Sequence, residues 1–161
     1  MIPRGIRNNN PLNIRRSESH QARLNGRVST DVDKVNIRRS KDQWQGLKKT
    51  QNDPSFCQFE TFEYGWRAAF VLLTRTYYHK YRLYTIRAIV SKWAPPNENN
   101  TRAYIDNVCR LTGIGPDEPL GIPSEHPARW MLVGAAMAIQ ENGTEVMDWL
   151  AMLRGWEKMR D

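Results

Sequence analysis

Cysteine is scarce in this 161-residue chain. Only Cys57 and Cys109 are present, far apart in the sequence and at no metal-binding spacing, so neither a disulfide framework nor a zinc site is expected. Histidine is scarce too, and none of the three has a partner at the spacing of a ligand set or a catalytic triad; they are His20, His79 and His126. Dinucleotide, P-loop and zinc motifs are missing. We therefore expect no cofactor and no metal ion.

Long apolar runs are also missing. The longest, from Trp130 to Ile139, has ten residues, which is too short to span a membrane. The first residues, MIPRGIRNNN, contain no apolar h-region, so we expect no signal peptide. Apolar residues still make up 40% of the chain, with six Trp and six Tyr, as is typical of a globular protein. At this length we expect a single domain, residues 1–161.

The charge is unbalanced towards basic residues. Lys and Arg number 24 against 17 acids, which gives a formal net charge of +7. A basic protein suits an anionic partner such as nucleic acid, a membrane surface or a charged cell-wall polymer; the alternative is that the charge serves solubility alone. Charge by itself does not choose among these.

The first 60 residues are rich in polar residues and poor in periodicity. A short repeat, NIRRS, occurs at 13–17 and again at 36–40. Weak alternation at 36–38 and 56–59 predicts short strands or a hairpin. The polar segment 17–39 is interpreted as an inserted loop or hairpin. This part of the chain therefore predicts a small β element.

From Phe62 onward the apolar residues recur at three- and four-residue steps, which predicts helices with one buried face. We expect Thr85 and Thr101 to begin two of these helices, and Pro95 and Gly113 to mark their ends. The predicted buried stripes are Phe62, Trp66, Ala69, Phe70, Leu73 and Tyr77; then Ile86, Ile89, Val90 and Trp93; then Tyr104, Ile105, Val108 and Leu111; and, in a last helix from about Thr144, Val146, Trp149, Leu150 and Leu153. The fold class is therefore predicted to be mainly α.

The helix that Pro127 opens is apolar on every face and then ends in a carboxylate, Glu141. Counted back by helical steps, Met137, Val133 and Trp130 lie on the same side as Glu141. If that side is core, the carboxyl group points inward at the helix end, and such a group can act as a general acid. The alternative is that Glu141 frays into solvent at the end of its helix.

Several stretches together resemble a phage-associated family of lysozyme-like cell-wall lytic proteins, which often carry names such as virion or structural protein. They are RGIRNNNPLNIR at 4–15, WQG at 44–46, FCQFETFEYGWRAAF at 56–70 and TIRAIVSKWAPPNENNTRAYIDNV at 85–108. The resemblance covers most of the chain in order and spacing. It implies a lysozyme-like fold and a role in cell-wall degradation.

The chain also resembles, more weakly, the lytic transglycosylases and bacterial glucosaminidases, in which a catalytic Glu closes a buried helix. A turn follows in that group, here matched by PLNI with Asn13, and later a helix matched by YIDNV with Tyr104. Trp44 resembles part of the β element after the turn. The Glu helix comes first in that group, whereas here the only similar segment, with Glu141, lies near the C-terminus. The resemblance therefore implies a circular permutation.

The resemblance implies an enzyme that cleaves the β-1,4 bond between N-acetylmuramic acid and N-acetylglucosamine, with Glu141 as general acid and base. Asn10, Asn13, Tyr104 and Trp44 are the implied substrate-binding residues. For the two Asn residues the alternative is turn formation, which NNNP favours anyway, and for Tyr104 it is a place in the core.

Glycoside hydrolysis usually needs two carboxylates, whereas a lytic transglycosylase works with one. No motif marks a second one here. We interpret Asp53, Glu60 and Glu63, the acidic residues near the expected cleft, as charges of loops or helix starts. A lytic transglycosylase is therefore favoured over a hydrolysing muramidase.

Two rival interpretations stay open: a catalytically inactive virion structural protein, and a basic nucleic-acid-binding protein, for which no reader motif is present. On the favoured interpretation the partner is the peptidoglycan glycan strand, without nucleic acid or a membrane span, and we expect a monomer. The protein would be a phage or prophage product made in the bacterial cytoplasm that acts, as an endolysin or virion enzyme, at the cell wall.

Overall fold

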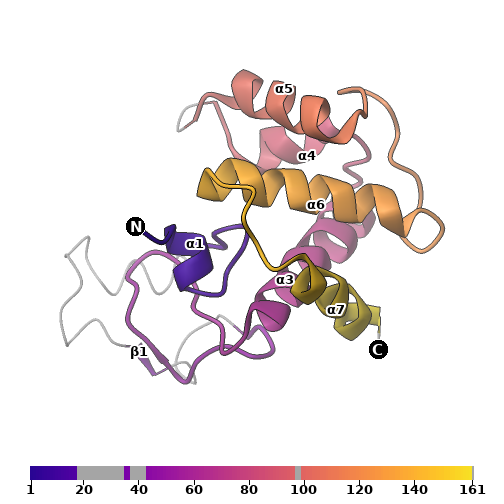
Figure 1. Ribbon diagram of the computed structural model, residues 1–161. Coiled ribbons are helices and arrows are strands. Elements are labelled where there is room, and N and C mark those ends of the chain that lie inside the picture. Colours follow the sequence, from indigo (N-terminus) through magenta and orange to yellow (C-terminus); the bar gives the residue numbers. More distant parts are fainter. Residues whose placement is uncertain (18–34, 37–42, 97–98, 161) are drawn as a thin grey trace. The chain divides into compact units, whose positions relative to one another are not determined.

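The computed structural model describes residues 1–17, 35–36, 43–96 and 99–160 (Figure 1). The chain forms two compact units, one made of 1–69 together with 147–161 and the other of 70–146. Most described residues lie in helices, with short paired strands in the first unit, so the mainly α class is confirmed. No helix among the described residues is long and apolar enough to cross a membrane. The prediction of one domain stays a prediction.

The first unit contains the small β element. β1 (Val35–Asn36) pairs antiparallel with β2 (Thr50–Gln51), with Val35 opposite Gln51. The predicted strand at 56–59 is not continuous, because Phe56 and Phe59 make only isolated bridges, to Arg15 and Leu47. Most of the predicted insertion at 17–39, and the second NIRRS beyond Asn36, lie outside the described residues.

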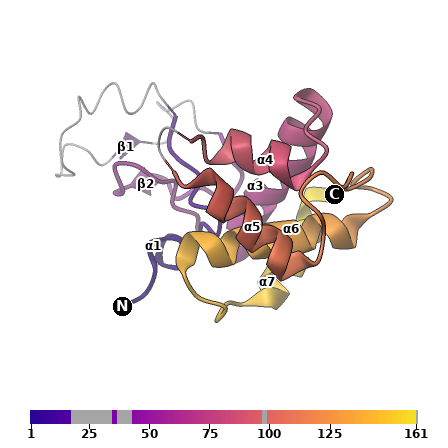
Figure 2. The ribbon, with the colours of Figure 1, turned by 90° about the horizontal axis from the view of Figure 1, so that it is seen from above.

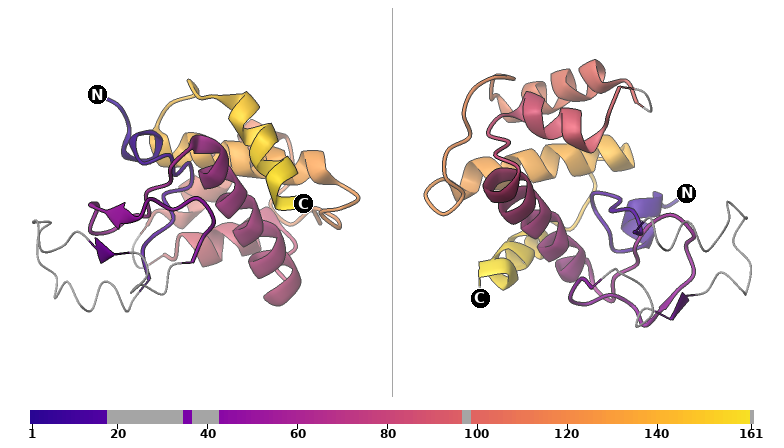
Figure 3. Two further views of the ribbon diagram at one scale, coloured as in Figure 1. Left: turned by 90° about the horizontal axis from the view of Figure 1, so that it is seen from below. Right: turned by 180° about the vertical axis from the view of Figure 1, so that it is seen from behind.

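The helices of the first unit are α1 (Arg4–Arg7), the larger part of α3 (Phe62–Val71) and α7 (Trp149–Arg160). α7 packs directly on α3 (Figure 3), and Gly155 makes this close approach possible. A Cβ atom at Gly155 would stand 2.5 Å from the Cβ of Trp66 and 2.9 Å from the Glu63 carbonyl oxygen. The fully buried Trp66 is thus covered by the backbone of α7.

The prediction for the last helix was wrong in both its start and its face. α7 begins at Trp149, where Asp148 accepts a hydrogen bond from the backbone N–H of Ala151 at 3.0 Å. Leu150 and Leu153, expected in the core, are exposed. The residues that α7 buries are Ala151, Gly155, Trp156 and Met159. Gly155 allows the close approach to α3, so the side of α7 that carries Gly155 is buried and the side that carries Leu150 and Leu153 is not.

The second unit is a group of helices in which α5 (Thr101–Thr112) packs against both α4 (Ile86–Trp93) and α6 (Pro127–Asn142). α5 and α6 run side by side in opposite directions (Figures 1 and 2). The start of α5 therefore lies beside the end of α6. The predicted stripes of α4 and α5 are buried except for Trp93 and Leu111, which are half-buried.

Most predicted helix boundaries in this unit are confirmed. Thr85 caps α4, Pro127 occupies the first turn of α6, and Gly113 and Gly143 end α5 and α6 in the left-handed conformation, with φ of 73° and 66°. The predicted cap of α5 was wrong by one residue. Asn100 is the N-cap, and it accepts the N–H of Ala103 at 3.1 Å.

The helix that starts with α3 continues as a π-helix, η3 (Leu72–Lys80). The wider turn shows in the hydrogen bond from the Tyr81 N–H to the Thr76 carbonyl, five residues back, at 3.0 Å. The predicted stripe stays buried at Phe70, Leu73 and Tyr77. The residue pattern did not predict this change of helix type, because apolar steps of three and four residues are compatible with both.

Candidate active site

Glu141 lies in the last turn of α6, one residue before the helix ends. The residues that precede it on the same side, Met137, Val133 and Trp130, are all fully buried, as predicted from helical spacing. Glu141 itself is half-buried. It is therefore not frayed into solvent: the buried side of α6 carries this carboxyl group to the edge of the core.

Two neutral donors from two other helices meet at one oxygen of Glu141. The Tyr104 hydroxyl, from the first turns of α5, donates to Oε2 at 3.0 Å. The Trp93 indole N–H, at the end of α4, donates to the same atom at 3.2 Å. The carboxyl group is thus held in one orientation by three helices of the same unit.

Two further hydrogen bonds near Tyr104 and Trp93 hold the ends of these helices together. The Thr101 hydroxyl, in the first turn of α5, donates to the carbonyl of Ala94, the residue that follows Trp93. Six residues further along α5, the Asn107 amide donates to Oε1 of Gln140 at 3.0 Å. Because Gln140 precedes Glu141, this bond also ties the last turn of α6 to α5. Side-chain hydrogen bonds from α5 therefore hold both the end of α4 and the end of α6.

The Tyr104 hydroxyl keeps its proton at this place and can donate it in a hydrogen bond to Glu141. Its side chain is 5% exposed. Burial, and then the negative charge of Glu141 that accepts its hydrogen bond, raise the pKa of Tyr104 well above its usual range. The hydroxyl therefore keeps its proton at any physiological pH, and the hydrogen bond to Glu141 persists. Tyr104 therefore has the core position that was the alternative for it, and its hydroxyl bonds to Glu141, whereas its role towards a substrate stays a prediction.

The other predicted substrate-binding residues, Asn10, Asn13 and Trp44, belong to the first unit. Asn10 is fully buried, and its amide group bonds to the backbone of Ile14, in both directions, and of Cys57 at 2.9–3.0 Å. These bonds make Asn10 a turn residue, the alternative stated above, so we do not carry it into the proposed site.

Asn13 lies at the end of the same turn with a positive φ of 53°, and its N–H donates to the Asn10 carbonyl at 3.0 Å. Asparagine tolerates this left-handed conformation better than most residues do. Trp44 is half-buried. Their roles towards a substrate stay predictions.

The three acidic residues weighed as a second carboxylate also lie in the first unit. Asp53 is buried, and it accepts hydrogen bonds from Arg4 at 2.6 and 2.7 Å, from Asn8 at 2.9 Å, and from two backbone N–H groups. Burial would raise its pKa, but these bonds outweigh burial and lower it. Glu63 faces Arg154 and Lys158 at 3.6 and 3.9 Å, and Glu60 is exposed. Asp53 and Glu63 thus have structural partners.

Two residues of the site were not predicted. Trp93 was assigned only to the buried stripe of α4, and Asn107 was not assigned at all. A buried tryptophan needs a hydrogen-bond partner for its indole N–H. The position of Trp93 at the end of an apolar stripe was therefore the feature of the sequence from which its role could have been predicted. Among the described residues, no cluster of three or more His, Cys, Asp or Glu side chains is arranged to hold a metal ion.

The fold and this site define a mainly helical protein with a carboxylate oriented by a tyrosine and a tryptophan at the meeting point of three helix ends. No protein-family model matches the chain. The chain is 35% identical to Protein P5 of Pseudoalteromonas phage PM2 over 154 residues. The matched region covers 96% of this chain and 80% of that protein. The chain therefore belongs to the same family as that phage protein, whose name states no activity.

Proposed function

We propose that this protein cleaves peptidoglycan glycan strands at the β-1,4 bond between N-acetylmuramic acid and N-acetylglucosamine, with Glu141 as general acid and base. The observation that carries the proposal is the pair of hydrogen bonds from Tyr104 and Trp93 to Oε2 of Glu141. A carboxyl group at the end of a buried helix, oriented by neutral donors, is positioned as proton-transfer catalysis requires.

The sequence resemblance and the site support the same assignment. The resemblance matches Glu141 with the catalytic Glu and Tyr104 with the tyrosine near the glycan, and these two side chains are bonded to each other at 3.0 Å. The two residues are 37 positions apart in the sequence, so their contact does not follow from chain proximity. The proposal includes a lysozyme-like fold in permuted order, with α6 as the catalytic helix.

A lytic transglycosylase needs one carboxyl group, and its two steps can be written with Glu141 alone. First, Glu141 donates its proton to the glycosidic oxygen, and the bond from C1 of the muramyl residue to that oxygen breaks, with the electron pair going to the leaving oxygen. The carboxylate then takes the proton of the muramyl 6-hydroxyl while that oxygen bonds to C1. The product is a 1,6-anhydro sugar, and Glu141 is protonated again.

A hydrolysing muramidase would need a second carboxylate to activate water or to form a covalent intermediate. The two side chains that donate to Oε2 of Glu141, Trp93 and Tyr104, are neutral. Asp53 and Glu63 are engaged with Arg and Lys in the first unit. We therefore favour transglycosylation over hydrolysis.

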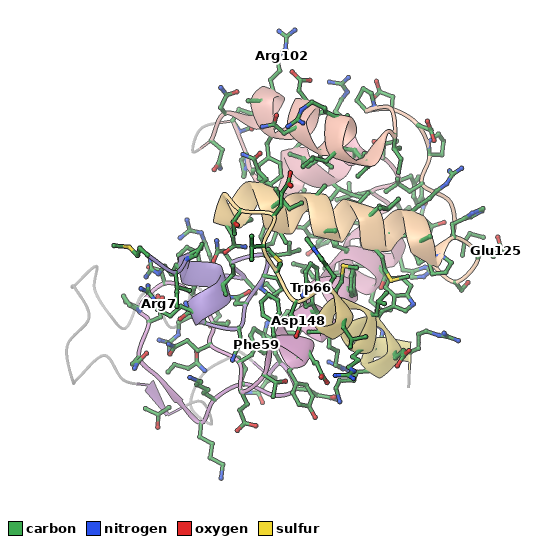
Figure 4. The ribbon with its side chains drawn as sticks, viewed as in Figure 1. Arg7, Phe59, Trp66, Arg102, Glu125 and Asp148 are labelled. Carbon is green, nitrogen blue, oxygen red and sulfur yellow. The ribbon has the colours of Figure 1, made fainter. Side chains whose placement is uncertain are left out.

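The decisive experiment is digestion of purified cell wall by the wild type and by Glu141→Gln, followed by mass analysis of the released fragments. We expect 1,6-anhydro fragments from the wild type and a loss of at least about 10²-fold in the variant, the scale of general acid–base catalysis. Glu125→Gln, an exposed glutamate of the same unit (Figure 4), is the matched control and should remain fully active.

Each result has a definite meaning. Reducing ends in place of anhydro ends would replace transglycosylation by hydrolysis and require a second carboxylate. If the wild type releases nothing, the enzymatic proposal is wrong, and the protein is better described as a virion structural component or a basic binding protein. Equal loss in the Glu125 control would show that charge, not Glu141, is responsible.

A further inference from the structure

A pocket of about 400 Å³ opens beside the last turn of α6. It is formed by the middle of α5 on one side and by the end of α6 with the following loop on the other. Gly143 contributes open space, because no atom lies within 4 Å of the position where its Cβ would be. The lining residues are Asn107, Arg110, Leu111, Ile139, Gln140, Gly143, Thr144 and Glu145.

The lining combines both signs of charge with amide groups. Arg110 and Glu145 are exposed, and in the part of the chain that the structure describes neither forms an ion pair. Asn107 and Gln140 are half-buried and bonded to each other at 3.0 Å, so the two amides are held in place in the lining. Such a lining suits a ligand that carries a carboxylate, an amino group and amide bonds.

We propose that this pocket binds the peptide stem of peptidoglycan, an inference that rests on the function proposed above. Stem peptides carry free carboxylates for Arg110, amide bonds for Asn107 and Gln140, and, where a diamino acid is present, an amino group for Glu145. Gln140 directly precedes Glu141, so a peptide held here would keep its muramyl residue near the carboxyl group. A glycan without its peptides keeps only the lactyl carboxylate next to the muramic acid ring and has no amino group for Glu145, and a nucleic acid would face the repulsion of Glu145.

The test compares binding of two probes to the full chain by calorimetry. One is the disaccharide N-acetylglucosaminyl-N-acetylmuramyl tetrapeptide, and the other is the same disaccharide without its peptide and with its lactyl carboxyl group converted to the methylamide, so that it carries no charge. Neither contains the bond from muramic acid to glucosamine, so neither is consumed. We expect the peptide-bearing probe to bind more tightly, and Arg110→Ala to weaken its binding about tenfold, the effect of losing one charged hydrogen bond.

Arg102→Ala is the matched control. Arg102 is exposed on the same helix and projects away from the start of α5 (Figure 4), so its loss should leave both affinities unchanged. A thermal melt of each variant checks that Arg110→Ala is folded.

Equal affinity for the two probes would overturn the inference, and so would equal weakening of both probes by Arg110→Ala. The binding result is independent of wall digestion. Peptide binding that depends on Arg110, in a protein that releases no fragments, would support the pocket and refute the enzyme. Fragment release without peptide preference would do the reverse.

Discussion

Replacing Tyr104 by Phe removes one of the two donors at Oε2 of Glu141 and leaves the ring in place. The hydrogen bond measures 3.0 Å, slightly long for an O–H donor, and the hydroxyl comes from a side chain that is 5% exposed. Because only the hydroxyl is deleted, the packing of α5 should be preserved. The substitution therefore isolates the contribution of this bond to the orientation of Glu141.

The size of the effect follows from the charge and exposure of the acceptor. Hydrogen bonds to charged groups contribute roughly 1.5–3 kcal/mol to stability. Glu141 is half-buried, so water can replace part of the lost bond, and the lower end of this range applies. About 1.5 kcal/mol corresponds to about tenfold in rate. We expect kcat to fall by about this factor, and the free energy of unfolding to fall by about 1.5 kcal/mol.

The assay is release of anhydro ends from soluble, uncross-linked glycan strands, measured over a range of substrate concentrations. If Tyr104 acts by orienting Glu141, kcat falls and KM is unchanged. If Tyr104 also contacts the glycan, as the resemblance implies, KM rises as well. Tyr84→Phe serves as the control, since Tyr84 is an exposed tyrosine of the same unit. Unchanged kcat, KM and stability in a folded Tyr104→Phe variant would refute the assigned role of this hydroxyl.

Two further predictions concern the stability of the first unit. Asp53→Asn should lower the free energy of unfolding by about 2 kcal/mol, because it weakens the bonds from Arg4 and from the backbone. Folding lowers the pKa of Asp53 from 3.8, so its contribution to stability is complete above pH 3.8 and is lost as the pH falls through the pKa of the folded state. The melting temperatures of wild type and variant should therefore converge as the pH is lowered. A constant difference between them at all pH values would contradict this. Gly155→Ala should lower the free energy of unfolding, measured in urea, by about 1–3 kcal/mol, because the added methyl group overpacks against Trp66. Leu153→Ala, on the exposed side of α7, is the control and should change stability by less than about 0.5 kcal/mol. An unchanged urea midpoint for Gly155→Ala would show that α7 can move away from α3 at no cost.

Local chemistry explains why most of the second unit was predictable. Thr85, Pro127, Gly113 and Gly143 act within one helical turn of themselves, through a cap, a fixed φ or a left-handed conformation, so their effect can be recognised without the rest of the chain. The buried side of α6 follows from helical periodicity alone. These local rules placed Glu141 on the core side of its helix.

The last helix shows where such rules end. Leu150 and Leu153 form a good apolar stripe, but α7 buries the side that carries Gly155. The decision depends on the shape of α3 at Trp66, and that shape is a property of the packed unit. The π-helical turn of η3 is similar, since the same residue steps fit either helix type.

The amino-acid sequence by itself determined which helices form, where most of them begin and end, and that Glu141 sits at the end of a buried side. Only the tertiary structure decided that Tyr104 and Trp93 share one oxygen of that carboxyl group, and that the Asn10 amide also bonds to the carbonyl of Cys57. The physical reason is range: caps, turns and periodicity act over a few residues, whereas these hydrogen bonds join atoms that are 37 to 48 positions apart and exist only once the chain has folded.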